Sequence, residues 1–186
     1  MANFKVTVFG GSNSRSGEPD YEQAYKLGQM LGAAGYIVIT GGYNGAMEAT
    51  SRGAAEMGGH VIGITCDEIE VWRPIGPNPW VMEERRYPTL RERLFALIDS
   101  CDAAFALPGG IGTLTEIVLT WNSLVIRAIT PRPLITIGNS WKRIIDAFTE
   151  EMNNYLPNTA RQLITCFTDV DTAVKFLTRN YPNSIS

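Results

Sequence analysis

Short apolar, β-branched segments alternate along the chain with longer segments in which apolar residues recur every three or four positions. The first pattern is typical of buried strands and the second of amphipathic helices. We predict strands at residues 5–9, 36–40, 60–64, 103–107, 133–137 and 163–167. We predict helices at residues 19–34, 44–57, 88–101, 112–127, 140–153 and 169–179.

Regular alternation of strands and helices implies right-handed crossovers and parallel strand pairing. The predicted fold is therefore α/β: a Rossmann-like, doubly wound, mostly parallel sheet with helices on both faces. The chain has no repeat, low-complexity tract or second composition regime, so residues 1–186 are expected to form a single domain. Residues 66–80 interrupt the alternation, and Pro74, Pro77 and Pro79 predict a long loop there.

Composition and charge exclude several classes of protein. A net charge of −3 argues against a duplex nucleic-acid partner, which normally requires a basic surface. The three cysteines are far apart and show neither metal-ligand spacing nor a disulfide framework. The N-terminus lacks a signal-peptide pattern, and no apolar run approaches the length of a membrane span. We expect a cytoplasmic protein without a metal, a membrane partner or a nucleic-acid partner.

Glycine clusters follow three of the predicted strands, at residues 10–14, 41–45 and 108–113. In a parallel sheet these clusters share the carboxyl edge, where such folds bind ligands. Glycine allows close approach of a ligand to the backbone, and helix N-termini present unpaired N–H groups to anions. We therefore predict phosphate binding by the three clusters, with plain tight turns as the alternative.

The two best-known phosphate motifs are missing. No Gly-x-Gly-x-x-Gly follows the first strand, and the second strand ends in Thr40 and Gly41 instead of an acidic residue for a ribose. No glycine loop is followed by Lys-Ser or Lys-Thr, which a P-loop requires. The ligand is therefore expected to be a mononucleotide or a related phosphate ester.

Glu116 and Arg93 are the candidate catalytic side chains. Glu116 stands three residues after Thr113, which predicts a helix-capping box, while a carboxylate near a helix N-terminus could also act in catalysis. Arg93 lies in the helix that a second capping box, Thr89 and Glu92, opens. The apolar stripe of this helix comprises Leu90, Leu94, Leu97 and Ile98. Arg93 flanks the stripe and could either reach a cleft or be an ordinary solvated arginine.

Residues 108–116, PGGIGTLTE, match the PGGxGTxxE signature of the Lonely Guy (LOG) family, whose members are often labelled lysine decarboxylase-like. Residues 41–47 resemble the second glycine loop of that family and residues 8–13 resemble its first. The arginine that precedes the signature in the family falls on Arg93. The resemblance extends from about residue 5 to residue 150.

The resemblance implies a phosphoribohydrolase. Such an enzyme hydrolyses the N-glycosidic bond of a nucleoside 5′-monophosphate, a cytokinin ribotide or AMP, to the free base and ribose 5-phosphate. It implies catalysis by Arg93 and Glu116, no cofactor, and a homodimer with sites near the interface. The phosphate- and nucleotide-binding residues it implies are Gly11, Ser12, Gly41, Gly42, Gly45, Met47, Gly109, Gly110, Gly112 and Thr113.

This sequence also departs from the family pattern. Tyr43 stands where the family commonly has a third glycine, and Glu48 follows Met47 where the family has glycine, which leaves the preferred base open. The decarboxylase label is rejected because pyridoxal phosphate needs a Schiff-base lysine near the cofactor. The lysines are Lys5, Lys26, Lys142 and Lys175, and none belongs to a glycine loop.

The alternative is a binder without catalysis, because residues 41–48 also resemble molybdenum-cofactor carrier proteins with the same glycine loops. Retention of both Arg93 and Glu116 favours the enzyme. In the proline-rich segment we expect Trp72, Arg73 and Trp80 to form part of a lid or a dimer contact, with surface packing as the alternative.

Overall fold

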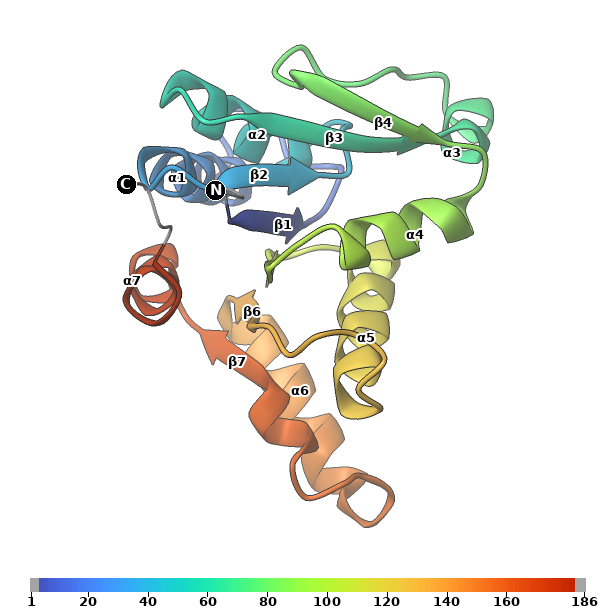
Figure 1. Cartoon of the computed structure of the whole chain (residues 1–186), viewed down its shortest axis with the longest axis vertical. Helices are drawn as coiled ribbons and strands as arrows, with labels where there is room; N and C mark the ends of the chain where they lie inside the picture. Colours follow the sequence, from blue (N-terminus) through green and yellow to red (C-terminus); the bar gives the residue numbers. More distant parts are fainter. Residues whose placement is uncertain (1–3, 183–186) are drawn as a thin grey trace.

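A computed structural model describes residues 4–182 and contains one seven-stranded sheet in the order β4-β3-β2-β1-β5-β6-β7 (Figure 1). The strands are β1 (Lys5–Phe9), β2 (Ile37–Thr40), β3 (Val61–Cys66), β4 (Glu83–Tyr87), β5 (Ala103–Ala106), β6 (Leu134–Ile137) and β7 (Ile164–Phe167). Every pair of neighbouring strands is parallel. The predicted Rossmann-like fold is thereby confirmed.

Helices cover both faces of the sheet (Figure 1). The helices are α1 (Pro19–Ala33), α2 (Ala46–Glu56), α3 (Asp67–Trp72), α4 (Leu90–Asp99), α5 (Ile111–Val125), α6 (Asn139–Glu151) and α7 (Val170–Asn180). Two 3₁₀ turns, η1 (Asn153–Tyr155) and η2 (Ala160–Leu163), lie between α6 and β7.

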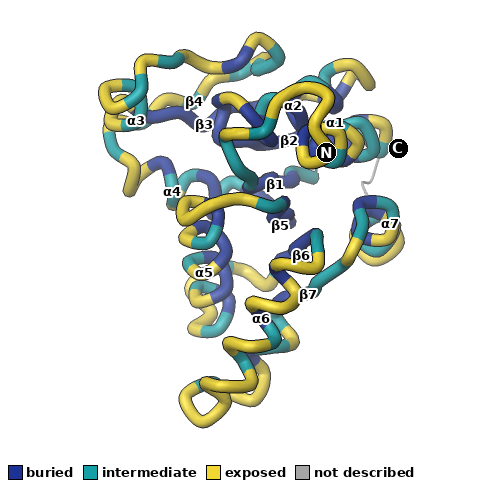
Figure 2. The backbone as a smooth tube through the Cα atoms, turned by 180° about the vertical axis from the view of Figure 1, so that it is seen from behind, coloured by how far each residue is buried: buried dark blue, intermediate teal, exposed yellow. Residues whose placement is uncertain are grey.

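Two apolar layers make up the core. Because side chains alternate along a strand, Val6 and Val8 of β1 face α1, α2 and α7, while Phe9 faces the layer of α4, α5 and α6. Figure 2 shows the strands buried between helices whose outer sides are exposed. Both layers contain large apolar side chains, such as Leu27 in the first and Trp121 in the second. Each face of the sheet is therefore covered by its own packed apolar layer.

The segment between β3 and α4 differs from the prediction of a long loop over residues 66–80. The chain continues β3 through Cys66, forms the short helix α3 and later adds β4. β4 was missed because its sequence, EERRY, is charged and lies at the edge of the sheet, where among residues 4–182 it pairs with β3 alone. Its side chains alternate between half-buried and exposed positions, so it lacks the apolar run of the inner strands.

Helix α4 begins at the predicted capping box. The Thr89 hydroxyl accepts from the Glu92 backbone N–H at 3.2 Å, and the Glu92 carboxylate accepts from the Thr89 backbone N–H. The predicted apolar stripe is only partly correct, since Leu97 and Ile98 are buried but Leu90 is 42% exposed. Leu90 borders a cavity instead of the core.

Candidate active site

The site lies where the direction of the strand order reverses. Successive strands move outward from β1 to β4 in one direction and from β5 to β7 in the other, so a crevice opens beyond the ends of β1 and β5. The three glycine clusters follow β1, β2 and β5, which are neighbours in the sheet. Their predicted meeting at the carboxyl edge is confirmed.

The three glycine loops bind one another through their backbones. The Gly11 N–H donates to the Pro108 carbonyl at 3.1 Å, and the Ala46 N–H donates to the Gly11 carbonyl at 2.8 Å. Gly45 has a φ of 72°, and a Cβ there would lie 2.5 Å from the Gly11 oxygen. A Cβ on Gly109 would lie 2.8 Å from the Gly11 nitrogen. These glycines therefore serve loop packing as well as any ligand.

A cavity of about 700 Å³ opens between these loops, α3, α4 and the start of α5. Its lining includes most of the predicted residues: Gly11, Ser12, Met47, Arg93, Gly109, Gly110, Gly112, Thr113 and Glu116. Gly41, Gly42 and Gly45 are buried and do not line it, although Gly45 lines a second, smaller cavity. The residues predicted from the sequence therefore include some that line this cavity and others that support its loops.

Arg93 is buried, with 5% of its surface exposed, so the alternative of a solvated arginine is wrong. Its Nε donates to the Ile64 carbonyl at 2.8 Å and its Nη2 to the Gly41 carbonyl at 3.1 Å. A Cβ on residue 41 would lie 2.1 Å from Nη2, so only glycine admits the guanidinium at this point. The strand ends thereby fix Arg93 in one orientation.

Glu116 does not form the predicted capping box. Helix α5 begins with Gly110 as its N-cap and no side-chain cap bond, which places Thr113 and Glu116 inside the helix. Glu116 is 8% exposed, and its Oε1 lies 3.9 Å from Nη1 of Arg93. Burial raises the pKa of this carboxyl to about 7, while the charge of Arg93 opposes the rise. The site therefore contains a carboxyl group that changes charge near neutral pH.

Tyr43 supports the site, and the sequence analysis did not assign it a role. Its ring centre lies 5.6 Å from the Arg93 guanidinium carbon. Its hydroxyl accepts from the Cys66 N–H at 2.9 Å and donates to the Cys66 carbonyl at 3.1 Å. Burial raises the pKa of the Tyr43 hydroxyl to about 12, so the side chain is neutral. An aromatic residue in place of a loop glycine was the signal for this packing role.

The proline-rich segment contributes to the cavity in part. Trp72, which is 80% exposed, and Arg73, which is half-buried, line the cavity at the end of α3. Trp80 does not line it and instead lies with its ring centre 5.8 Å from the Arg52 guanidinium carbon. The Asn78 amide donates to the carbonyls of Gly42 and Tyr43, which anchors this segment to the second glycine loop.

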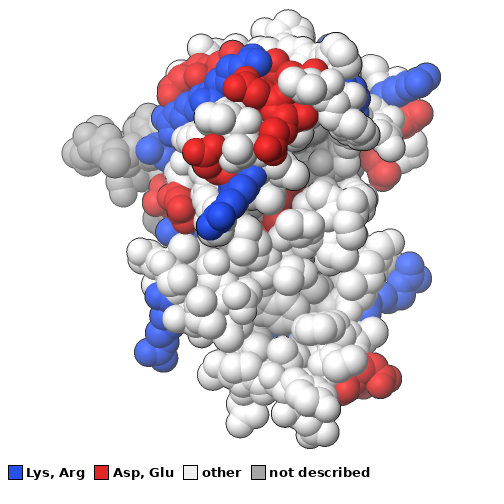
Figure 3. Space-filling view, turned by 90° about the vertical axis from the view of Figure 1, so that its right-hand side faces the viewer, with Lys and Arg blue, Asp and Glu red and all other residues white. Residues whose placement is uncertain are grey.

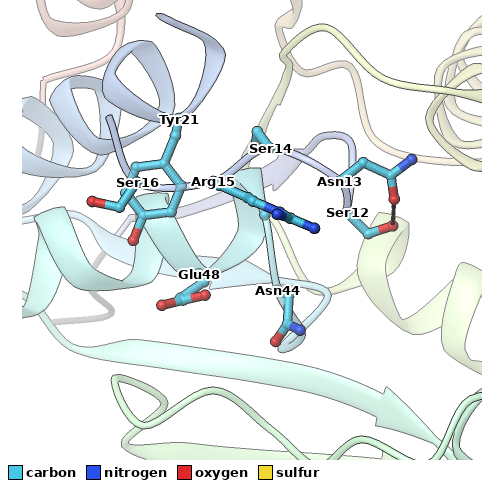
Figure 4. Close-up of a pocket in the computed structure, with 9 residues that line it drawn as sticks. Ser12, Asn13, Ser14, Arg15, Ser16, Tyr21, Asn44 and Glu48 are labelled. Carbon is cyan, nitrogen blue, oxygen red and sulfur yellow. Dashed lines mark hydrogen bonds between the residues drawn. The ribbon is translucent and has the colours of Figure 1, made fainter. Parts of the chain in front are cut away.

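A second cavity of about 470 Å³ adjoins the first and shares Ser12, Asn13 and Ser14 with it. Figure 4 shows Tyr21 and Glu48 on one side of this cavity and Ser12 and Asn13 on the other. Over residues 4–182 no group of histidine, cysteine and carboxylate side chains has the arrangement of a metal site. Within the same range no helix has the length and apolar content needed to cross a membrane.

Comparison with known proteins identifies the family. The family model of the SLOG cluster4 family matches residues 3–154, most of the chain. The chain belongs to the SLOG cluster4 family. This confirms the family resemblance seen in the glycine loops and in residues 108–116.

Relatives of this SLOG cluster4 protein include named hydrolases of nucleotides. It is 32% identical to the cytokinin riboside 5′-monophosphate phosphoribohydrolase LOG3 of Arabidopsis thaliana, over 86% of this chain and 75% of the relative. It is also 32% identical to the pyrimidine/purine nucleotide 5′-monophosphate nucleosidase of Escherichia coli K12, over 77% of this chain but only 34% of that enzyme. At the level of the family, these names support nucleotide hydrolysis.

A solved structure supports the fold alone. The molybdenum cofactor binding protein from Rippkaea orientalis superposes with a TM-score of 0.74 at 22% identity, covering 97% of this chain and 98% of that one. Shared architecture at this identity does not transfer a ligand.

Proposed function

We propose that this protein hydrolyses the N-glycosidic bond of nucleoside 5′-monophosphates and releases the free base and ribose 5-phosphate. The observation that carries the proposal is the buried pair of Arg93 and Glu116, which faces the cavity between the glycine loops. The relatives that are named phosphoribohydrolase and nucleosidase support the same reaction class.

Glu116 is the proposed catalytic carboxylate. Cleavage of the bond develops positive charge on the ribose, as in glycoside hydrolysis. An ionised carboxylate near C1 stabilises that charge and orients a water molecule. The water oxygen bonds to C1, the base leaves with the bonding electron pair, and a proton from the water balances the charge. Because the pKa of Glu116 is about 7, the ionised form is accessible at neutral pH.

Arg93 is the proposed partner of Glu116 and of the ribose. Two of its nitrogens are bound to the Ile64 and Gly41 carbonyls, while Nη1 faces Glu116 across 3.9 Å. A fixed guanidinium at this place lowers the pKa of the carboxyl and can donate to ribose hydroxyl groups. Preorganised donors of this kind lower the activation barrier because they need little rearrangement during the reaction.

Residues 109–113 are proposed to bind the phosphate. They form the N-terminal end of α5, where backbone N–H groups lack partners within the helix. Gly109, Gly110 and Gly112 keep this end accessible, and a Cβ added at Gly110 or Gly112 would meet no atom within 4 Å. A helix N-terminus that faces a cavity favours an anionic group.

A molybdenum-cofactor carrier remains the alternative function. A carrier would use the glycine loops, but nothing in cofactor binding requires a buried carboxyl next to Arg93. Desolvation makes such a carboxyl costly to keep ionised, so its presence favours a catalytic role.

We further propose a homodimer in which α5 forms the interface. An apolar groove of about 430 Å³ on this helix is lined by Ile111, Leu114, Thr115, Val118, Leu119 and Asn122. Ile111 and Thr115 also line the catalytic cavity, so the groove continues into the site. Figure 3 shows charged side chains gathered around α3 and β4, while the surface over α5 is largely uncharged. A second copy bound to this groove would place both sites near the shared interface. We also propose that the protein is cytoplasmic.

Chromatographic analysis of the products tests the proposed reaction. Purified protein is incubated with AMP and with isopentenyladenosine monophosphate, and free base and ribose 5-phosphate are quantified together. Release of both products in equal amounts is the expected result, and the faster substrate identifies the preferred base. Binding of these nucleotides without any product would contradict hydrolysis and would favour a carrier.

A further inference from the structure

We propose that Arg73 binds the 5′-phosphate of the substrate and makes the site selective for nucleotides over nucleosides. The reaction itself rests on the proposed function above, whereas binding of a phosphate ester is testable without turnover. Arg73 follows α3 and lines the catalytic cavity.

Few positively charged side chains line the cavity and are available to a bound phosphate. Among the described residues that line it, the charged side chains are Arg73, Arg93, Asp20 and Glu116. Arg93 is committed to two backbone carbonyls and faces the Glu116 carboxyl. A phosphate monoester carries close to two negative charges at neutral pH. Arg73 is therefore the cation that can neutralise it.

The guanidinium of Arg73 is also only partly satisfied by the residues that the structure describes. Its Nη1 donates to the Ser12 hydroxyl at 3.4 Å, whereas its buried Nε has no hydrogen-bond partner among residues 4–182. Within residues 4–182 it belongs to no ion pair, whereas the nearby Arg86 pairs with both Asp67 and Glu70. A buried guanidinium nitrogen without an acceptor is costly, so its position indicates an acceptor supplied by a ligand.

The position of Arg73 suits an anion held at the start of α5. Its contact, Ser12, follows Gly11, and a Cβ on Gly11 would lie 3.3 Å from the Cα of Gly109. Arg73 thus approaches the first glycine loop, which packs directly against the third. The backbone N–H of Arg73 donates to the Ile69 carbonyl at 2.7 Å, which fixes the end of α3. A guanidinium beside a helix N-terminus is a strong combination for phosphate.

Calorimetric titration of the whole protein with ribose 5-phosphate and with AMP tests the proposal, alongside KM for AMP and kcat/KM for adenosine. Arg73→Gln is expected to weaken both affinities and to raise KM for AMP by about 10- to 100-fold, the range for loss of one or more charge-assisted hydrogen bonds. The rate with adenosine, which has no phosphate, stays unchanged. The control Arg91→Gln removes an exposed arginine of α4 that does not line the cavity and leaves all values unchanged.

The outcomes separate this proposal from the proposed reaction. If wild type hydrolyses AMP and Arg73→Gln keeps wild-type affinity for ribose 5-phosphate, the role of Arg73 is refuted and the reaction stands. If wild type binds ribose 5-phosphate without hydrolysing any nucleotide and Arg73→Gln loses binding, the reaction is refuted and the role of Arg73 stands. Absence of binding to wild type overturns the role of Arg73. Should Arg73→Gln unfold, Arg73→Lys, which keeps the charge but not the fork, is expected to lose less affinity.

Discussion

Nη1 of Arg93 lies 3.9 Å from Oε1 of Glu116, with both side chains almost completely buried. The distance is too long for a hydrogen bond but short enough for the cation to act on the pKa of the carboxyl. Burial prevails over the cation, and the pKa of Glu116 is raised to about 7. The pair therefore keeps a carboxyl group balanced between its charged and neutral forms.

The rate should depend on pH through Glu116. If its carboxylate is the active form, kcat rises about tenfold per pH unit below the pKa near 7 and levels off above it. Arg93→Gln removes the cation that lowers this pKa, so the rising limb should move to higher pH. Initial rates between pH 5 and pH 9 measure both profiles. A kcat that falls as pH rises would instead assign the activity to the protonated acid.

The same pKa predicts a cost to stability. In the folded protein Glu116 stays protonated up to about pH 7, whereas the unfolded chain releases the proton near 4.5, so the unfolding free energy falls between these values. Glu116→Gln removes this loss and should be more stable than wild type at pH 8 by on the order of 3 kcal/mol, with little difference at pH 4. Urea denaturation at both pH values measures it.

The control for that experiment is Glu150→Gln, which changes an exposed carboxylate of α6. It should leave the pH dependence of unfolding as in wild type. Equal stability of wild type and Glu116→Gln at pH 8 would show that the buried carboxyl carries no such penalty.

Gly41 leaves room for the Arg93 guanidinium because it has no side chain, and we predict that this space is needed for activity. Gly41→Ala would bring a Cβ within 2.1 Å of Nη2 of Arg93 and 2.5 Å of the Met47 sulfur. The flexible Met47 end can move, but Arg93 must give up its bond to the Gly41 carbonyl. Because small misplacements of catalytic groups are costly, kcat should fall roughly 100-fold while the fold persists. Steady-state kinetics measure the loss, and circular dichroism checks the fold.

Gly76→Ala is the matched control, because a Cβ there would meet no atom within 4 Å. It should keep the wild-type kcat. A Gly41→Ala protein with wild-type kcat would show that the orientation of Arg93 does not matter for turnover.

The repeating apolar pattern was sufficient to predict the inner strands and their helices, because packing against both faces requires continuous apolar runs. It was insufficient for β4 at the sheet edge, where the charged side chains of residues 83–86 are alternately half-buried and exposed. It was also insufficient for α3. The acidic first turn of this helix follows β3 directly, and none of its residues is fully buried. Elements at the margin of a fold bury little, so little of their sequence is constrained.

The sequence was sufficient to name many residues of the candidate site but not their contacts. The residues at 109–113 and the pair of Arg93 and Glu116 could be located from motifs. The capping box expected at Thr113 and Glu116 was wrong because Gly110 begins the helix earlier and turns the glutamate inward. The contacts of Tyr43 with Cys66 and of Arg73 with Ser12 join segments that are distant in sequence, so no local pattern reveals them.

The dimer proposal is tested at Val118, which is 49% exposed in the groove of α5. Val118→Lys places a charge on this apolar surface and should halve the mass measured by light scattering, because burying an unpaired ammonium is unfavourable. Met57→Lys, at a residue that is 44% exposed after α2, should leave the dimer intact. A wild-type protein that is monomeric at micromolar concentration would refute the interface.

The most direct test of the account compares wild type with Glu116→Gln at pH 8, following free adenine and ribose 5-phosphate from AMP. We expect equimolar release by wild type and at least a 100-fold lower rate for the variant, the usual scale for loss of an acid–base or charge-stabilising group. AMP should still bind to the variant, since the phosphate contacts are intact. Equal rates for the two proteins would contradict the role of Glu116, and no release by wild type would contradict the proposed hydrolysis of AMP.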